Sequence, residues 1–288
     1  MGVTTTERAT TDQRHPVRDA GLLVALDVDG TVVHHDGHLS PRVVDKVRAL
    51  DALPHVSVVI ATGRSVVATL PVMEQLGLLT PGRPAVCSNG AVTVSVDPDA
   101  DGGFRLDDVV TFDPAPAIAV VHQELPHALV AVEEIGVGFK VSTPFPPGEL
   151  WGEEAVVSFE ELVADPVTRV TFRDPHSTSE EFREMVERIG LHGVTYAVGY
   201  SAWLDLAPEG VSKASALEQV RRRLCVEPHR TVAAGDQRND LEMLQWASRS
   251  YAMGQAPAEV IAAADRVTGT VEEDGLVDAL DEVLAELA

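Results

Sequence analysis

The strongest constraint on the fold of this 288-residue chain is a series of short, mostly apolar runs that alternate with helix patterns. Such runs are typical of strands covered on both faces, and their alternation with helices predicts a parallel, doubly wound α/β sheet with right-handed crossovers. We expect strands at 22–26, 56–60, 85–87, 231–234 and 250–253. We expect helices at 41–50, 65–76, 213–224, 241–247 and 277–287.

The character of the sequence changes after residue 90. Val92, Val94 and Val96 alternate with polar residues, which indicates antiparallel strands with one face in water. Further strand patterns follow at 167–172 and 196–206, and a helix pattern covers 182–189. The parallel pattern resumes only after this stretch, which indicates an insertion.

We therefore predict a discontinuous core that carries an inserted domain. The core comprises residues 21–92 and 207–288, and residues 93–206 form an α+β insert. Residues 1–20 are polar and lack periodicity, so we expect a disordered tail there.

Charge and composition disfavour several classes of protein. The chain has 45 acidic and 22 basic side chains, a formal net charge of −23, which would repel nucleic acid and anionic membranes. No apolar run approaches the roughly 20 residues that span a bilayer, and the N-terminus lacks the apolar stretch of a secretory signal. Two cysteines cannot build a disulfide scaffold. We expect a soluble, cytoplasmic protein whose oligomeric state the sequence does not reveal.

Polar residues that could take part in catalysis or ligand binding follow the predicted strands. Asp27, Thr62 and Asp236 each lie just past the carboxyl end of an apolar run. In an open parallel sheet these ends face one crevice, where ligands bind, so distant segments should converge there. The segments of interest are DVDGT at 27–31, TGR at 62–64, the lysine at 213 and GDQRND at 235–240.

This convergence would crowd four carboxylates into one pocket. Two carboxylates about 4 Å apart repel by roughly 4 kcal/mol at an effective dielectric of 20, and a bound cation relieves that repulsion. No His or Cys accompanies them, so the ligands are hard oxygens, which suit Mg²⁺ and a substrate phosphate in its shell. The four are Asp27, Asp29, Asp236 and Asp240.

In this order, the four segments resemble the motifs of haloacid dehalogenase (HAD) superfamily phosphatases. The insert between the second and third motifs resembles the class IIB cap of the Cof-like branch. The resemblance covers residues 21–288 and implies a Rossmann-like, HAD-like core with an inserted α+β cap. Gln255 and Asp205 stand where this branch more often has Asn and Glu. Further similar strings are SNGA at 88–91, WLDLAPEGVSK at 203–213 and MGQA at 253–256.

The resemblance implies a catalytic role for four side chains. Asp27 would be the nucleophile that attacks phosphorus and forms an aspartyl-phosphate. Asp29 would protonate the leaving oxygen as general acid and then activate water as general base. Thr62 and Lys213 would bind the transferring phosphoryl group, and Lys213 would offset the charge of Asp27.

The resemblance also implies a Mg²⁺ cofactor and a substrate-binding set. The metal would be held by the carboxylates of Asp27 and Asp236 and the backbone carbonyl of Asp29, with support from Asp240. Arg64 would pair either with substrate or with another motif, and the Asn89-Gly90 turn could present Asn89 to the crevice. The set expected at the substrate is Thr62, Gly63, Arg64, Asn89, Lys213 and Asn239.

The function that we expect is a Mg²⁺-dependent phosphatase of small organic phosphate monoesters, with sugar phosphates favoured. Its partner would be a small phosphorylated metabolite, and the insert would close over the crevice and select it. Three alternatives stay open. They are a phosphosugar mutase similar to the phosphomannomutases, a nucleotide or cofactor-precursor phosphatase, and a catalytically idle protein-binding module.

Two further segments carry weaker signals. His34, His35, Asp36 and His38 resemble a metal cluster, but their spacing is not that of a helical pair, so a solvated flap is favoured. The 136–145 stretch is our candidate for substrate selection, because its glycines allow a tight loop that bears Phe139 and Lys140; an ordinary strand and turn is the simpler interpretation.

Overall fold

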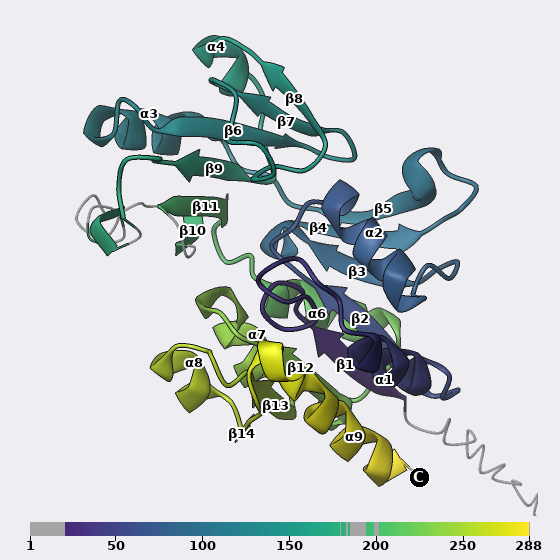
Figure 1. Ribbon diagram of the computed structural model, residues 1–288. Helices are drawn as coiled ribbons and strands as arrows, with labels where there is room; N and C mark the ends of the chain where they lie inside the picture. Colours follow the sequence, from purple (N-terminus) through teal and green to yellow (C-terminus); the bar gives the residue numbers. More distant parts are fainter. Residues whose placement is uncertain (1–20, 179, 183, 185–193, 199–201, 288) are drawn as a thin grey trace, which may run out of the picture.

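The computed structural model describes residues 21–178, 180–182, 184, 194–198 and 202–287. The predicted tail at 1–20 and most of the predicted helix over 182–189 lie outside these residues. The described chain forms two β-sheets, one above the other in Figure 1. Within the described residues, each helix is too short or too polar to cross a membrane.

The larger sheet has eight strands in the order β14-β13-β12-β1-β2-β3-β4-β5. Its pairs from β14 to β3 are parallel, which confirms the predicted α/β class. Strand β1 lies at its centre, as expected for an unbroken apolar run. The strands are β1 (Leu22–Leu26), β2 (Val56–Ala61), β3 (Pro84–Cys87), β4 (Val92–Val96), β5 (Phe104–Val109), β12 (Thr231–Gly235), β13 (Arg249–Ala252) and β14 (Arg266–Val267).

Helices cover both faces of this sheet, and β1 shows the two-sided burial. Leu22, Val24 and Leu26 join the apolar cluster of α1, α2 and α9, whereas Leu23 and Ala25 join that of α6, α7 and α8. Because neighbouring side chains in a strand point to opposite faces, a strand buried on both faces needs apolar residues throughout. The helices are α1 (Pro41–Asp51), α2 (Val66–Leu76), α6 (Lys213–Arg223), α7 (Leu241–Trp246), α8 (Ala258–Ala263) and α9 (Gly275–Leu287).

The predicted start of the insert at residue 93 falls inside β4. Strand β4 pairs antiparallel with β3, and β5 with β4, so both strands extend the larger sheet. The valine alternation predicted the antiparallel pairing, but the expected wet face is wrong, because Thr93 and Ser95 are buried as well. We propose that the insert begins after β5 and ends with β11 (Trp203–Pro208), since β11 belongs to the smaller sheet.

The smaller sheet has six strands in the order β10-β11-β9-β6-β7-β8, and only β7 and β8 pair in parallel. Helices α3 (Ala115–Glu124) and α4 (Phe159–Leu162) contribute to the apolar cluster on one face, together with Val130, Phe172 and Leu204. The remaining strands are β6 (Leu129–Glu134), β7 (Gly138–Val141), β8 (Glu153–Val156), β9 (Val170–Arg173) and β10 (Val194–Val198).

The other face of the smaller sheet carries polar and aromatic residues and turns toward the larger sheet. On β11, Leu204 and Leu206 join the helix-covered cluster, so the alternating positions Trp203 and Asp205 point the other way. Both line the pocket between the two sheets. The insert therefore presents its helix-free face to the core, as the arrangement in Figure 1 illustrates.

Candidate active site

The ends of three adjacent strands converge as predicted. Asp27 follows β1, Thr62 follows β2, Asp236 follows β12, and these strands are neighbours in the order β12-β1-β2. Above them lies a pocket of about 420 Å³ between the two sheets. The predicted site residues that line it are Asp27, Asp29, Gly63, Arg64, Asp236 and Asn239. The others, Thr62, Asn89, Lys213 and Asp240, do not line it.

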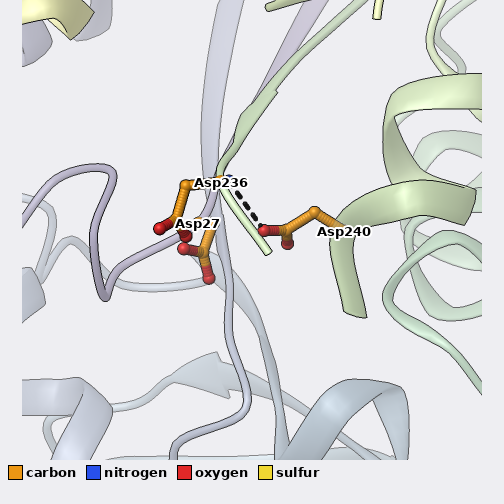
Figure 2. Close-up of side chains that lie close together, drawn as sticks. All are labelled: Asp27, Asp236 and Asp240. Carbon is orange, nitrogen blue, oxygen red and sulfur yellow. Dashed lines mark hydrogen bonds between the residues drawn. The ribbon is translucent and has the colours of Figure 1, made fainter. Parts of the chain in front are cut away.

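Three buried carboxylates and one lysine form what we call the floor: Asp27, Asp236, Asp240 and Lys213. The candidate ligand oxygens of the three acids lie within 4.8 Å of one another, and Figure 2 shows Asp27 and Asp236 side by side with Asp240 approaching from another direction. The Lys213 Nζ donates to Oδ1 of Asp27 and to Oδ1 of Asp240, at 2.6 Å in each case. Only 1% of Lys213 is exposed.

The electrostatics of the floor leave an excess of negative charge. Burial, followed by the carboxylate of Asp240, holds the pKa of Asp27 well above its usual range, although Lys213 acts in the opposite direction. Burial alone would lower the pKa of Lys213, but Asp240 and Asp27 outweigh it and raise that pKa. Lys213 therefore stays cationic, and one buried cation faces three acids. This balance favours a second cation at the floor.

Asp240 acts as a local organiser of the floor. Its Oδ1 accepts from Lys213, and its Oδ2 accepts from the backbone N–H groups of Asp236 and Gln237, both at 3.0 Å. Figure 2 shows the bond to Asp236 as a dashed line. Both oxygens are thus engaged, so Asp240 fixes the loop that presents Asp236 as well as the position of the lysine.

Asp236 closely approaches the backbone of Gly30, which explains the glycine of the first motif. Gly30 has a φ of +79°, and a Cβ there would lie 2.2 Å from Asp236 Oδ2. Gln255 Nε2 donates to the Gly30 carbonyl at 2.6 Å and lies 3.3 Å from the same Asp236 oxygen. Gln255 was not predicted as a site residue, although the MGQA string that contains it carried the signal.

Asp29 lies at the mouth of the site and is held by Arg64. Its side chain is 61% exposed, and it accepts from Arg64 Nε at 2.9 Å and Nη2 at 2.5 Å. Arg64 therefore contacts another motif, which was one of the two expected outcomes. Thr62 is fully buried, and its Oγ1 accepts from the Arg64 N–H at 3.1 Å, which shapes the loop.

Asn89 and Asn239 meet across the site. The Asn239 Nδ2 donates to Asn89 Oδ1 at 3.0 Å, and Asn239 lines the pocket. Asn89 has a φ of 54°, a left-handed conformation that Asn tolerates better than most residues. The structure thus joins Asn89 to the site through Asn239.

The opposite wall of the pocket, which we call the roof, comes from the insert. We use the name for five of its residues, Phe139, Trp151, Arg169, Trp203 and Asp205; Gly148, Glu149 and Leu150 also line the pocket from the insert. Of the 136–145 candidates, Phe139 lines the pocket, whereas Lys140 pairs with Glu134 at 3.4 Å and does not line it. The other four were not predicted, and the strand alternation at 203–206 was the available signal for two of them.

The histidine-rich loop after the first motif makes surface contacts. His34 lies 3.4 Å from Asp274, His35 lies 2.5 Å from Glu272, and the rings of His34 and His38 meet edge to face at 5.4 Å. In the described part of the chain, the floor acids are the only group of three or more potential ligands close enough to share an ion. His35 and His38 are exposed, as expected for a solvated flap, whereas the His34 side chain is only 15% exposed.

The sequence profile of the haloacid dehalogenase-like hydrolases matches residues 24–134 and 149–280 of this chain. A phosphoglycolate phosphatase of Natronomonas pharaonis is 31% identical over 90% of this chain and 96% of its own length. A 5-amino-6-(5-phospho-D-ribitylamino)uracil phosphatase of Bacillus subtilis is 27% identical, over 90% of this chain and 96% of its own length.

Solved structures show the same fold. A sugar phosphatase described as HAD subclass IIB superposes with a TM-score of 0.75 at 23% identity, covering 91% of this chain and 98% of that one. A haloacid dehalogenase-like hydrolase from Bacteroides thetaiotaomicron gives a TM-score of 0.73 at 20% identity, and the match covers 91% of this chain and 99% of that one. At these identities the likeness concerns the arrangement of both sheets.

Proposed function

Since this chain belongs to the haloacid dehalogenase-like hydrolases and is a phosphatase of their Cof-like branch, we propose that it hydrolyses small organic phosphate monoesters with Mg²⁺. Sugar phosphates are the favoured substrates. The observation that carries this proposal is the floor, where three buried acids and a single lysine lie beneath a pocket large enough for a metabolite.

The donors at the floor fit Mg²⁺. They are carboxylate oxygens without nitrogen or sulfur, and the excess negative charge calls for a cation. The carboxylates of Asp27 and Asp236 and the backbone carbonyl of Asp29 would hold the metal, with Asp240 in support. When bound, the metal would neutralise charge on these acids and on the substrate phosphoryl group.

Asp27 and Asp29 would carry the two chemical steps. A carboxylate oxygen of Asp27 attacks phosphorus in line, and the bond to the leaving oxygen breaks as Asp29 donates a proton to it. Asp29 then takes a proton from water, whose oxygen attacks the aspartyl-phosphate and releases inorganic phosphate and Asp27. The exposure of Asp29 suits this proton exchange, and its two bonds to Arg64 fix its direction.

The other floor and loop residues would stabilise the transferring phosphoryl group. Lys213 holds Asp27 in place and, because the ammonium stays cationic, favours the ionised form of Asp27 against the opposing effects of burial and Asp240. Thr62, Gly63 and Asn239 would offer donors to the phosphoryl oxygens, with Asn89 fixing Asn239. Such preorganised donors stabilise charge as it develops in the transition state.

The roof supports a leaving group larger than a two-carbon acid. A pocket of about 420 Å³ with three aromatic side chains suits a ring or polyol, and Asp205 can accept bonds from its hydroxyl or amino groups. Because these aromatic rings can also stack on a heterocycle, a nucleotide or cofactor precursor is the second candidate. A panel of phosphorylated metabolites with phosphate release as the readout separates them. Transfer of the phosphoryl group from one position of a hexose to another would instead indicate a phosphosugar mutase.

The direct test uses the purified protein and p-nitrophenyl phosphate. We expect phosphate release that requires Mg²⁺, ceases with EDTA and returns on adding Mg²⁺. Asp27→Asn should be inactive, whereas Asp45→Asn, which alters an exposed acid on α1, should match wild type. Unchanged activity in Asp27→Asn contradicts the nucleophile assignment. The cytoplasmic location and the exclusion of nucleic acid and membrane partners stay predictions from composition.

A further inference from the structure

The loop that carries Thr62 and Arg64 accepts hydrogen bonds from the core at two of its carbonyls and from the insert, which we call the cap from here on, at a third. The Asn89 N–H donates to the Thr62 carbonyl at 3.0 Å, and the Ser88 N–H donates to the Arg64 carbonyl at 2.8 Å. The carbonyl between them, that of Gly63, accepts instead from Arg169 Nη1 at 2.5 Å. Arg169 directly precedes β9 of the cap. One peptide group of this loop thus bonds to the other domain.

Arg169 is held in place by its neighbours in the cap. Its side chain is 8% exposed, and its guanidinium lies 5.1 Å from the centre of the Phe139 ring. Its Nε lies 3.6 Å from a carboxylate oxygen of Glu133, whose side chain is fully buried. A buried guanidinium with a nearby carboxylate and an aromatic ring has few alternative positions, so it presents Nη1 to Gly63 in a defined direction.

Glu133 contacts the core as well. The Ser88 hydroxyl lies 2.8 and 2.7 Å from the two Glu133 oxygens, and Thr168 of the cap donates to one of them at 3.1 Å. Ser88 is the same residue whose N–H binds the Arg64 carbonyl. Arg169 therefore contacts the 62–64 loop at Gly63, and Glu133 contacts the neighbouring 88–89 segment at Ser88.

These contacts are suited to reversible closure. If the cap moved away, Glu133 and Arg169 would remain together on the cap and would regain water, while Ser88 and the Gly63 carbonyl would lose their cap partners. Neither charge would be left buried and alone, which is the costly outcome for ionised groups. The loop, in contrast, would lose a charge-assisted bond that fixes its middle peptide.

We propose that Arg169 is a positioning residue that orders the Thr62–Arg64 loop when the cap is closed, and that Glu133 holds it in place. Arg169 acts on the reaction through the Gly63 peptide, since this loop also carries the arginine that orients Asp29. The inference rests on the proposed phosphatase reaction only for its kinetic readout; the exchange readout below does not need turnover.

The kinetic test compares Arg169→Ala, Arg169→Lys and a matched control. Arg83 is the control, because it is a partly buried arginine, with a side chain 14% exposed, that pairs with Asp51 and donates to the Val58 carbonyl away from the pocket. Phosphate release is measured with p-nitrophenyl phosphate and with glucose 6-phosphate. We expect Arg169→Ala to lower kcat roughly 10–100-fold by the same factor for both substrates. Arg169→Lys should keep part of the kcat that Arg169→Ala loses, and Arg83→Ala should leave kcat unchanged.

Hydrogen exchange supplies the second readout. In Arg169→Ala the amides of Ser88 and Asn89, which bond to the 62–64 carbonyls, should exchange faster, while those of β1 keep wild-type rates. If Arg169→Ala does not fold, Ser88→Ala should show the same faster exchange at Asn89. Unchanged kcat and exchange overturn the proposal, as does an equal effect in Arg83→Ala. A loss of kcat with only one of the two substrates also overturns the proposal, since that pattern indicates that Arg169 contacts the leaving group directly.

Discussion

The floor and the roof of the pocket are built on opposite principles. The floor acids follow parallel strands of the core or lie just beyond them and are almost fully buried, and two of them, Asp27 and Asp240, pair with one lysine. The roof side chains come from strands and loops of the cap that are distant in sequence, and Trp151 is 54% exposed. The floor is a set of buried, opposed charges, whereas the roof combines three aromatic rings with Arg169 and Asp205 and is partly open to water at Trp151.

This difference suggests that the floor serves the reaction common to all substrates and the roof serves the choice among them. Buried charges hold each other in place, so a change at any floor residue disturbs the others. The roof residues other than Arg169 would contact the variable part of a substrate. We therefore expect floor substitutions to affect every substrate and to affect folding. Substitutions of Phe139, Trp151, Trp203 or Asp205 should instead discriminate among substrates, whereas Arg169, which bonds to the Gly63 carbonyl, should act on all of them.

The largest effect should come from Lys213→Met, which keeps the bulk and removes the charge at the floor. We expect kcat to fall roughly 10³-fold for all substrates, since the phosphoryl group loses a preorganised cation. Without added metal the free energy of unfolding should fall by about 3 kcal/mol, because two buried carboxylates lose their partner. Steady-state kinetics and urea unfolding measure the two effects. A loss of kcat that differs from one substrate to another would contradict the expected difference between floor and roof.

Gly30→Ala should have the next largest effect, through geometry alone. The new Cβ would collide with the Asp236 carboxylate, so that carboxylate must move. We expect a drop of about 10²-fold in kcat and weaker activation by Mg²⁺ in titrations. Gly37→Ala is a suitable control, because Gly37 also has a positive φ but open space around it. Similar losses in both variants would point to backbone strain instead.

Trp203→Ala tests the roof. Removing this ring should raise KM about tenfold for the preferred metabolite, since a buried aromatic contact contributes about 1.5 kcal/mol. The kcat for p-nitrophenyl phosphate should change little, because the floor is intact. A parallel series with Phe159→Ala, an exposed ring of α4 outside the pocket lining, controls for surface effects. Equal loss on every substrate would remove the distinction between floor and roof.

The smallest effect concerns the helix that carries Lys213. Hydrogen bonds, that from Arg221 first, lower the pKa of Glu218 on α6 to about 2. A folded-state pKa below the unfolded value stabilises the protein above about pH 4.5, and this contribution is lost as the pH falls toward 2. Solvent screening limits it to about 0.5–1 kcal/mol. The stability gap between wild type and Glu218→Gln, from urea unfolding at pH 6 and pH 3, should therefore narrow in acid.

The floor could be predicted from the sequence because each of its parts is local. Asp27 and Asp236 follow apolar runs that could only be buried parallel strands, and the order of strands in a doubly wound sheet brings their ends together. The glycine at position 30 belongs to the DVDGT segment that follows the first of these runs, and the lysine at 213 begins a predicted helix. What remained open was the partner of Arg64, which depends on a side-chain torsion that no pattern records.

The roof could not be predicted in the same way. Glu133 belongs to β6 and Arg169 directly precedes β9, so their meeting depends on the pairing of these two strands in the smaller sheet. The sheet to which β4 belongs could not be read from the sequence for a similar reason, because an alternating strand can extend either sheet and the choice depends on which strand offers a free edge.

The sequence by itself determined the fold class, the crevice and the acids that gather there, because strand burial and motif order are properties of short segments. Only the tertiary structure decided which face of the cap meets the core, that Asp240 organises the floor, and that Arg169 bonds to the Gly63 carbonyl. These depend on strand register and domain closure, and both are settled by contacts between residues far apart in the chain.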